Sequence, residues 1–278
     1  MTKIRKSFGV ALCRLNKNLQ PEIMLVKKKN SYYFFEFILG KYQKNNDKYL
    51  MKLFNNMTYR EKIEILELNF DNLWYKLWLE LPNQNTQNKY FNKTNNWNIK
   101  QGNKNKELTC YEKKKLHVYI KNKSKFESAF LHDSGKRLKY LINNSTNAES
   151  LWEIPKGRKT QQEKKMDTAI REFEEETSIN SSNYSILWHV PPVTESFKDA
   201  GITYKNTYYL ATANLINGQL WDPKVCFNSY SQTLEIESVK WVSLKEIEFL
   251  LLTKISKKRI LKLYKSIIAL FKKNCKTL

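Results

Sequence analysis

Cysteine and histidine are scarce in this chain of 278 residues, and neither type is clustered. The four cysteines form no C-x-x-C pair and are too few for a disulfide scaffold. Their spacing argues against a zinc site, and three separated histidines argue against a histidine-based triad or metal centre. We therefore expect reduced thiols in a cytosol-like compartment. The residues concerned are Cys13, Cys110, Cys226, Cys275, His117, His132 and His189.

Long apolar runs are also missing. No run approaches the roughly 20 residues of a transmembrane helix, and the basic start of the chain leads into no apolar signal-peptide core. We therefore expect no transmembrane segment. The hydrophobic content of 41% is that of a globular chain, and at roughly 150 residues per domain the length allows one large domain or two small ones.

Acidic residues are few, because 27 Asp and Glu face 49 Lys and Arg, for a net charge of +22. The excess is concentrated in residues 83–125, with eleven lysines and two glutamates, and in residues 254–278, with nine basic residues and no acid. Such segments favour a polyanionic partner such as RNA. A base-composition bias is the alternative explanation, since Asn, Ile and Tyr are also abundant, but it would not prevent RNA binding.

Strand-like segments lie towards both ends of the sequence, and a helical stretch separates them. The helical pattern begins near Ile38, and Thr58 with Glu61 forms a capping box. Asp71 is expected to cap the following helix. Further helices are expected over residues 126–141, 163–177 and 258–271, and strands over 7–15, 22–26, 151–155, 185–190, 203–212 and 236–242.

This order predicts an α/β core made of two discontinuous pieces, residues 1–36 and 146–278. Residues 37–145 are predicted to form an inserted all-α subdomain with a basic loop rich in Asn and Lys. The basic C-terminal helix carries apolar residues on one face, including Ile260, Tyr264 and Phe271. We interpret this face as packing on the protein's own core, in preference to a membrane-surface or RNA-binding role.

One acidic segment stands out in this basic chain. On a helix, Glu172, Glu175 and Glu176 are spaced at i, i+3 and i+4, which places three carboxylates on one face. Their mutual repulsion would be relieved by a hard divalent cation, and Mg²⁺ prefers carboxylate and phosphate oxygens. A solvated acidic helix is the simpler alternative.

The same segment resembles the Nudix box, G-x5-E-x7-R-E-U-x-E-E-x-G-U, where U is a bulky apolar residue. The matching residues are Gly157, Glu163, Arg171, Glu172, Phe173, Glu175, Glu176 and Ile179. Ser178 replaces the second glycine, which normally ends the helix in a left-handed turn, so we expect a cost on the order of 1 kcal/mol there and retained activity.

The likeness extends beyond the box to the Nudix mRNA-decapping proteins of large DNA viruses. It is carried by residues 7–14, 54–58, 73–78 and 151–157, and it leaves 83–125 as an expansion of this chain. The resemblance implies a Nudix α/β/α sandwich with a mixed sheet, interrupted by the helical insertion. It also implies hydrolysis of a phosphoanhydride bond with Mg²⁺ or Mn²⁺.

The resemblance implies a role for each residue of the box. Glu172, Glu175 and Glu176 would bind the metal with the Gly157 carbonyl, while Glu163 and Arg171 would orient these ligands. Related enzymes use a further Glu on a distant loop as ligand or base. Glu235 fits that position, Glu237 is its competitor, and Glu153 is a weaker ligand candidate.

Substrate contacts are expected from aromatic and basic side chains. A methylated guanine is held by stacking and cation–π contact, for which Phe8, Tyr204 and Tyr208 are candidates, although most aromatic residues of any chain belong to its core. Lys156 and Arg158 flank Gly157 and could contact phosphates. For the RNA body the candidates are Lys27, Lys28, Lys29, Lys113, Lys114 and Lys115.

The resemblance implies a decapping enzyme acting on capped mRNA in the host cytoplasm, with the virion as a further location. Alternative substrates are diphosphoinositol polyphosphates and dinucleoside polyphosphates. An inactive Nudix fold that binds RNA is an alternative of another class, against which the intact carboxylates argue. The sequence leaves the oligomeric state open.

Overall fold

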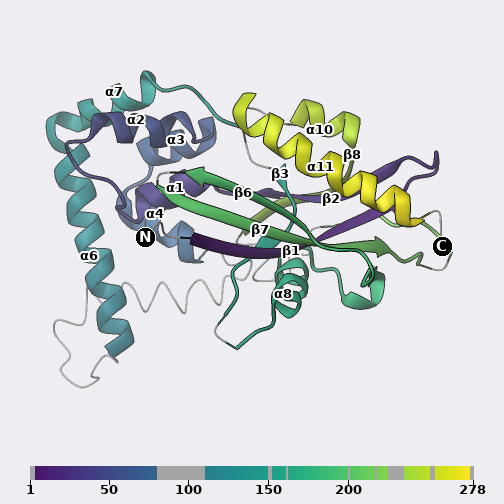
Figure 1. The fold of residues 1–278 in the computed structure, drawn as a ribbon. Coiled ribbons are helices and arrows are strands. Elements are labelled where there is room, and N and C mark those ends of the chain that lie inside the picture. Colours follow the sequence, from purple (N-terminus) through teal and green to yellow (C-terminus); the bar gives the residue numbers. More distant parts are fainter. Residues whose placement is uncertain are drawn as a thin grey trace. The chain divides into compact units, whose positions relative to one another are not determined.

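The computed structural model describes residues 4–79, 110–149, 152–160, 162–199, 201–216, 218–224, 235–250 and 254–275. The chain forms two compact units, one made of Met1–Lys28 with Leu151–Leu278 and the other of Lys29–Ser150 (Figure 1). By compactness the helical unit therefore begins before residue 37 and ends after residue 145. The division into independent domains stays a prediction.

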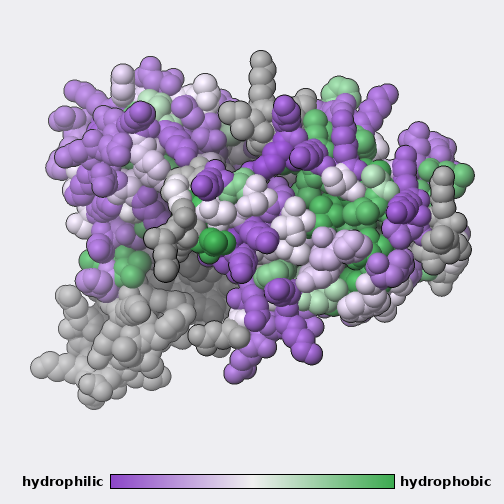
Figure 2. Space-filling view, viewed as in Figure 1, coloured by the Kyte–Doolittle hydropathy of each residue, from purple (hydrophilic) through white to green (hydrophobic). Residues whose placement is uncertain are grey.

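The Lys29–Ser150 unit consists of helices around an aromatic core that includes Phe37, Phe54, Phe126 and Phe130. Hydrophilic residues cover most of the face of this unit seen in Figure 2. The described elements are α1 (Tyr32–Ile38), α2 (Asp47–Asn55), α3 (Tyr59–Glu67), α4 (Phe70–Leu79), α6 (Cys110–Phe130), the short η1 (His132–Gly135) and α7 (Lys136–Asn143).

Local signals set several helix ends in this unit. The capping box is confirmed, since Thr58 accepts from the Glu61 backbone and Glu61 accepts from the Thr58 backbone. The helical pattern starts earlier than expected, at α1, because the Ser31 side chain accepts from the Phe34 N–H. The cap expected at Asp71 is wrong, because Asp71 lies inside the first turn of α4 and binds Lys123 at 2.8 Å.

The single helix expected over residues 126–141 is two helices. Asp133, Ser134 and Gly135 have φ values of 51°, 55° and 73°, which no right-handed helix can contain. The predicted basic loop falls largely outside the described residues.

The other unit is a mixed sheet. Its path runs β3-β2-β1-β7-β5, with β4 on β1, β6 on β7 and β8 on β2. Strand β1 is parallel to β7, whereas the other pairs are antiparallel. The strands are β1 (Ile4–Leu15), β2 (Pro21–Lys28), β3 (Trp152–Glu153), β4 (Lys156–Gly157), β5 (Tyr184–Ile186), β6 (Val193–Asp199), β7 (Ile202–Ala213) and β8 (Ile236–Ser243).

Helices cover both faces of this sheet (Figure 1). Helix α8 (Lys165–Thr177) packs on one face through Ala169 and Phe173. Helices α10 (Leu244–Leu250) and α11 (Lys254–Cys275) pack on the other, where Ile247, Tyr264 and Ile267 are buried. A short η2 (Ser181–Asn183) precedes β5. The predicted α/β/α sandwich with a mixed sheet and a helical insertion is confirmed.

The apolar face of α11 is buried against the sheet, as the sequence pattern predicted. Strand β6 was not predicted, because its sequence VTESFKD alternates with polar and charged residues. In the described part of the chain, no helix is both long and apolar enough to cross a membrane.

Candidate active site

Gly157 brings the edge of the sheet against helix α8. Strand β4 pairs with β1 so that Phe8 lies opposite Gly157 and Gly9 opposite Lys156. A Cβ atom on Gly157 would lie 1.9 Å from the carboxyl carbon of Glu172, and one on Gly9 would lie 2.1 Å from the Pro155 carbonyl oxygen. Position 9 therefore requires glycine, because its neighbour is backbone, whereas a side chain at residue 157 would displace the Glu172 carboxylate, which lies directly against the backbone there.

Arg171 joins three carboxylates of the predicted site. Its Nε donates to Glu163 at 2.6 Å, while its two terminal nitrogens lie 2.9 Å from Glu172 and 2.9 Å from Glu175. It also donates to the backbone carbonyl of Arg158 at 3.3 Å. This is the geometry that the orienting role predicted for Glu163 and Arg171 requires.

Glu163 is held as an ionised acceptor. It accepts from Arg171, the Thr160 backbone and the Thr168 hydroxyl, and these hydrogen bonds lower its pKa to about 2. A carboxylate that stays charged keeps the Arg171 guanidinium fixed beside Glu172 and Glu175.

Lys28, at the end of β2, faces three further carboxylates. Its Nζ lies 2.8 Å from Glu176, 3.2 Å from Glu235 and 3.9 Å from Glu153. The Lys28 ammonium group is engaged by these acids, and its predicted RNA-binding role stays a prediction. These contacts could not be predicted from the sequence, because they depend on the pairing of β2 with β8 that places Lys28 opposite Ile236.

The charged groups of this cluster, together with burial, shift the pKa values of their neighbours. Burial raises the pKa of Glu176 to about 7, although the attraction of Lys28 opposes the change. Burial alone would lower the pKa of Lys28, but Glu176, Glu153 and Glu235 outweigh it and the pKa is raised. Burial also acts on Glu153, where Lys156 and Lys28 outweigh it and lower the pKa. We infer that Lys28 is the fixed positive charge of the cluster.

The structure separates Glu235 from its competitor. Glu235 faces Lys28 and adds repulsion that helps raise the pKa of Glu172, after burial as the larger cause. Glu237 instead pairs with Lys27 at 2.8 Å. This placement favours Glu235 as the additional acid, and the predicted ligand role of both Glu153 and Glu235 stays a prediction.

The carboxylates contact cations of the protein itself. Among the described residues, no three His, Cys, Asp or Glu side chains are arranged closely enough to hold a metal ion. The donor set is nonetheless composed of oxygen atoms only, which suits Mg²⁺ or Mn²⁺. The five acids around Gly157 and Lys28 are Glu153, Glu172, Glu175, Glu176 and Glu235.

Two of the three aromatic candidates are buried. Phe8 and Tyr208 are 5% and 2% exposed, so neither ring can stack with a ligand in this structure. Tyr204 is half-buried and stacks on Phe197, with ring centroids 5.2 Å apart and planes inclined by 12°. The guanidinium of Arg259 lies 3.7 Å from the centre of the Phe197 ring.

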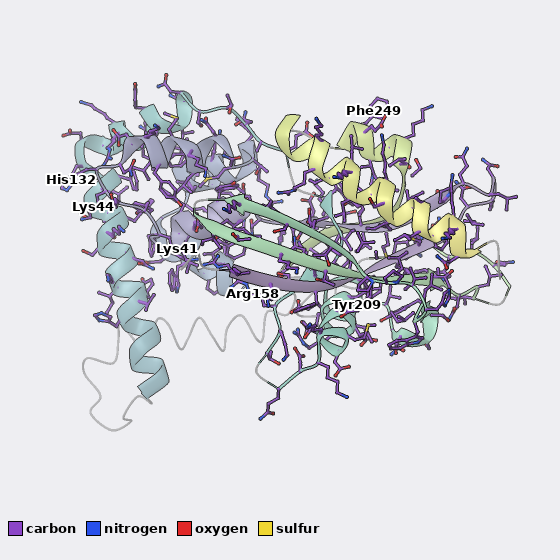
Figure 3. The ribbon with its side chains drawn as sticks, viewed as in Figure 1. Lys41, Lys44, His132, Arg158, Tyr209 and Phe249 are labelled. Atoms are coloured by element: carbon purple, nitrogen blue, oxygen red, sulfur yellow. The ribbon has the colours of Figure 1, made fainter. Side chains whose placement is uncertain are left out.

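The basic candidates are dispersed. Lys156 forms an ion pair with Glu153, whereas Arg158 is exposed in the loop after β4 (Figure 3). Lys27 pairs with Glu237, and Lys29 belongs to the helical unit. Lys113, Lys114 and Lys115 lie on α6, but their side chains are outside the described part of the chain.

A polar group on β6 and β7 was missed by sequence reasoning. Glu195 accepts from Asn206 at 2.9 Å and from the Tyr208 hydroxyl at 3.2 Å, and its other oxygen lies 3.4 Å from Arg259 Nε. The pair Glu195–Asn206 is set by the hairpin register, which could not be read without β6.

Comparisons with known proteins agree with the resemblance to the Nudix box. The model of the NUDIX domain matches residues 128–264. The mRNA-decapping protein g5R of African swine fever virus, isolate Warthog/Namibia/Wart80/1980, is 33% identical over 254 residues, which cover 89% of each chain. The same protein of isolate Pig/Kenya/KEN-50/1950 is 33% identical over 256 residues, again covering 89% of each chain.

Among solved structures, the crystal structure of a Caenorhabditis elegans Ap4A hydrolase binary complex is 12% identical. The match covers 95% of this chain and 98% of the hydrolase chain, with a TM-score of 0.40. On the family match and its viral relatives, the chain belongs to the Nudix hydrolases, the family of metal-dependent pyrophosphohydrolases.

Proposed function

We propose that this protein removes the 5′ cap of mRNA by hydrolysing a phosphoanhydride bond, releasing 7-methyl-GDP and RNA with a 5′-monophosphate. The observation that carries this proposal is the cluster of carboxylates around Gly157 on a chain related at 33% to viral decapping proteins. Capped mRNA is the proposed partner, and the host cytoplasm, where such RNA is translated, is the proposed location.

The proposed mechanism assigns metal binding to one set of residues and positioning of the carboxylates to another. Glu172, Glu175, Glu176, Glu235 and the Gly157 carbonyl would hold Mg²⁺ or Mn²⁺. When bound, the metal would neutralise the substrate phosphates and make water a better nucleophile. Arg171 and Glu163 keep the carboxylates of α8 in position, and Lys28 limits repulsion within the cluster.

Tyr204 is the proposed platform for the methylated base, and it is supported by stacking on Phe197, whose own ring face is covered by Arg259. Stacked aromatic rings attract a cationic base through their faces. Glu195 lies on the same strand face as Phe197, two residues away, and its carboxylate, engaged by Asn206, Tyr208 and Arg259, holds the Arg259 guanidinium beside Phe197. Exposed Arg158 is placed to contact phosphates near Gly157.

Competing substrates separate this proposal from its alternatives. Capped RNA, a diphosphoinositol polyphosphate and a dinucleoside polyphosphate would be given to the protein with Mn²⁺, and kcat/KM would be compared. We expect capped RNA to be preferred and uncapped RNA to inhibit at low salt. Faster cleavage of a small polyanion, without inhibition by RNA, would indicate that small polyanions are the substrate class of this enzyme. Binding of RNA with no cleavage of any substrate would indicate an inactive module.

A further inference from the structure

The exposed face of helix α11 carries five lysines, with Ser266 and Ala269 between them. The apolar side of the helix is buried on the sheet, whereas the five lysines on the opposite side are exposed to solvent. No acidic residue occurs anywhere in α11. We call these residues the lysine face: Lys258, Lys262, Lys265, Lys272 and Lys273.

The lysines of this face form no ion pairs with other described residues of the protein. Arg259 differs from these lysines, because it turns inward to Glu195 and Phe197. On the neighbouring helix α10, Glu246 is engaged by Ser243 at its N-terminus.

The face is elongated and regular. From Lys258 to Lys272 it runs about 21 Å along the helix, because each residue adds about 1.5 Å. A shallow groove of about 560 Å³ follows part of it, lined by Lys258, Leu261, Lys262, Lys265, Ser266 and Ala269. A linear row of cations matches a linear row of phosphates.

We propose that the lysine face binds the phosphate backbone of the RNA that follows the cap. A membrane surface fits less well, because a membrane-bound amphipathic helix inserts its apolar face into lipid. In α11 that face is covered by the sheet, with Tyr264 and Ile267 1% and 0% exposed.

The lysine face also begins beside the proposed base platform. Arg259, next to Lys258 in sequence, lies over Phe197, and Phe197 stacks on Tyr204. A cap held on the Tyr204 ring would place the attached RNA near the start of the row. This inference rests on the proposed function, since it assigns a path to the body of the same substrate.

The test compares two triple variants of the full chain. Lys258→Gln/Lys262→Gln/Lys265→Gln removes three charges from the face, and Lys17→Gln/Lys48→Gln/Lys139→Gln removes three exposed charges elsewhere. Affinity for a fluorescent uncapped RNA would be measured by anisotropy over a range of salt concentrations. The slope of log K against log salt should fall by about 2 for the first variant, because each phosphate contact on a single strand contributes about 0.7.

Three results would overturn the proposal. The first is an unchanged slope in the lysine-face variant, and the second is an equal loss in the control variant. The third is loss of binding to phosphatidylcholine–phosphatidylserine vesicles with RNA binding intact, which would assign the face to membranes. Circular dichroism would verify that both variants are folded.

A cap dinucleotide without an RNA body separates this inference from the proposed function. The lysine-face variant should hydrolyse it as the wild type does, while losing efficiency on long capped RNA. If the wild type hydrolyses neither substrate, the decapping proposal fails, and the RNA-binding measurement still decides the role of the face.

Discussion

At the scale of single residues, Gly157 is the position where the absence of a side chain matters most. The Glu172 carboxylate occupies the space that a Cβ atom would fill. A carboxylate held in this way is oriented by contact with the backbone as well as by Arg171. The first glycine of the box is thus explained by packing.

We expect Gly157→Ala to displace Glu172 and to lower turnover by about 10²-fold, the effect of misplacing a catalytic group by about 1 Å. The crowding should also cost about 1–3 kcal/mol of stability. Steady-state kinetics and urea unfolding would measure both effects. Gly218→Ala is the control for turnover, which should be unchanged because no atom lies within 4 Å of the added Cβ; its own loss of stability would come from the φ of 73° at that position.

Ser178 occupies the left-handed turn that ends α8. Its φ of 57° and ψ of 24° are those that favour glycine, as expected from the box. Ser178→Gly should therefore stabilise the protein by up to about 1 kcal/mol. Ser196→Gly, in strand β6, should instead destabilise it by about 0.5–1 kcal/mol. Equal changes in urea midpoint for the two variants would contradict this interpretation.

At the scale of elements, the ion pair between Lys28 and Glu176 joins the end of β2 to α8. Both side chains are largely shielded from water, with 19% and 6% of their surface exposed. Lys28→Met should therefore cost about 3 kcal/mol in the presence of EDTA, because it leaves buried acids without their cation. Lys27→Met, which breaks an exposed pair with Glu237, should cost less than about 1 kcal/mol.

The double variant Lys28→Met/Glu176→Gln tests the cause. If repulsion and burial of unpaired charge produce the loss, removing the Glu176 charge should restore part of the stability without restoring activity. Urea unfolding in EDTA would measure the recovery. An additive loss in the double variant would show that Lys28 acts through packing.

The sequence could predict contacts within one helix but not contacts that depend on the pairing of distant strands. The carboxylates of α8 were predicted because helical spacing alone brings residues i, i+3 and i+4 together. Lys28 and Glu235 meet only through the register of β2 and β8, which are separated by about two hundred residues of chain. The burial of Phe8 and Tyr208 could not be predicted, because the sequence does not show which aromatic side chains of a strand are covered by a helix.

At the scale of the whole molecule, acidic and basic residues are concentrated in different places. The chain carries a net charge of +22, yet five of its 27 acidic residues lie together around Gly157 and Lys28. An acidic centre suits a divalent cation, whereas basic surfaces suit the polyanionic substrate. This separation supports the proposal of an enzyme that acts on RNA with metal ions.

The most direct test of this account uses RNA labelled in the cap, incubated with Mg²⁺ or Mn²⁺ and the wild type, Glu175→Gln or Glu174→Gln. Glu175 is bound by Arg171 in the cluster, whereas Glu174 accepts from the Ser181 backbone on another side of α8. We expect release of 7-methyl-GDP by the wild type and Glu174→Gln, with at least a 10²-fold loss in Glu175→Gln. Equal release by all three proteins would contradict the assignment of α8 to metal-dependent catalysis, and no release by any of them would contradict decapping.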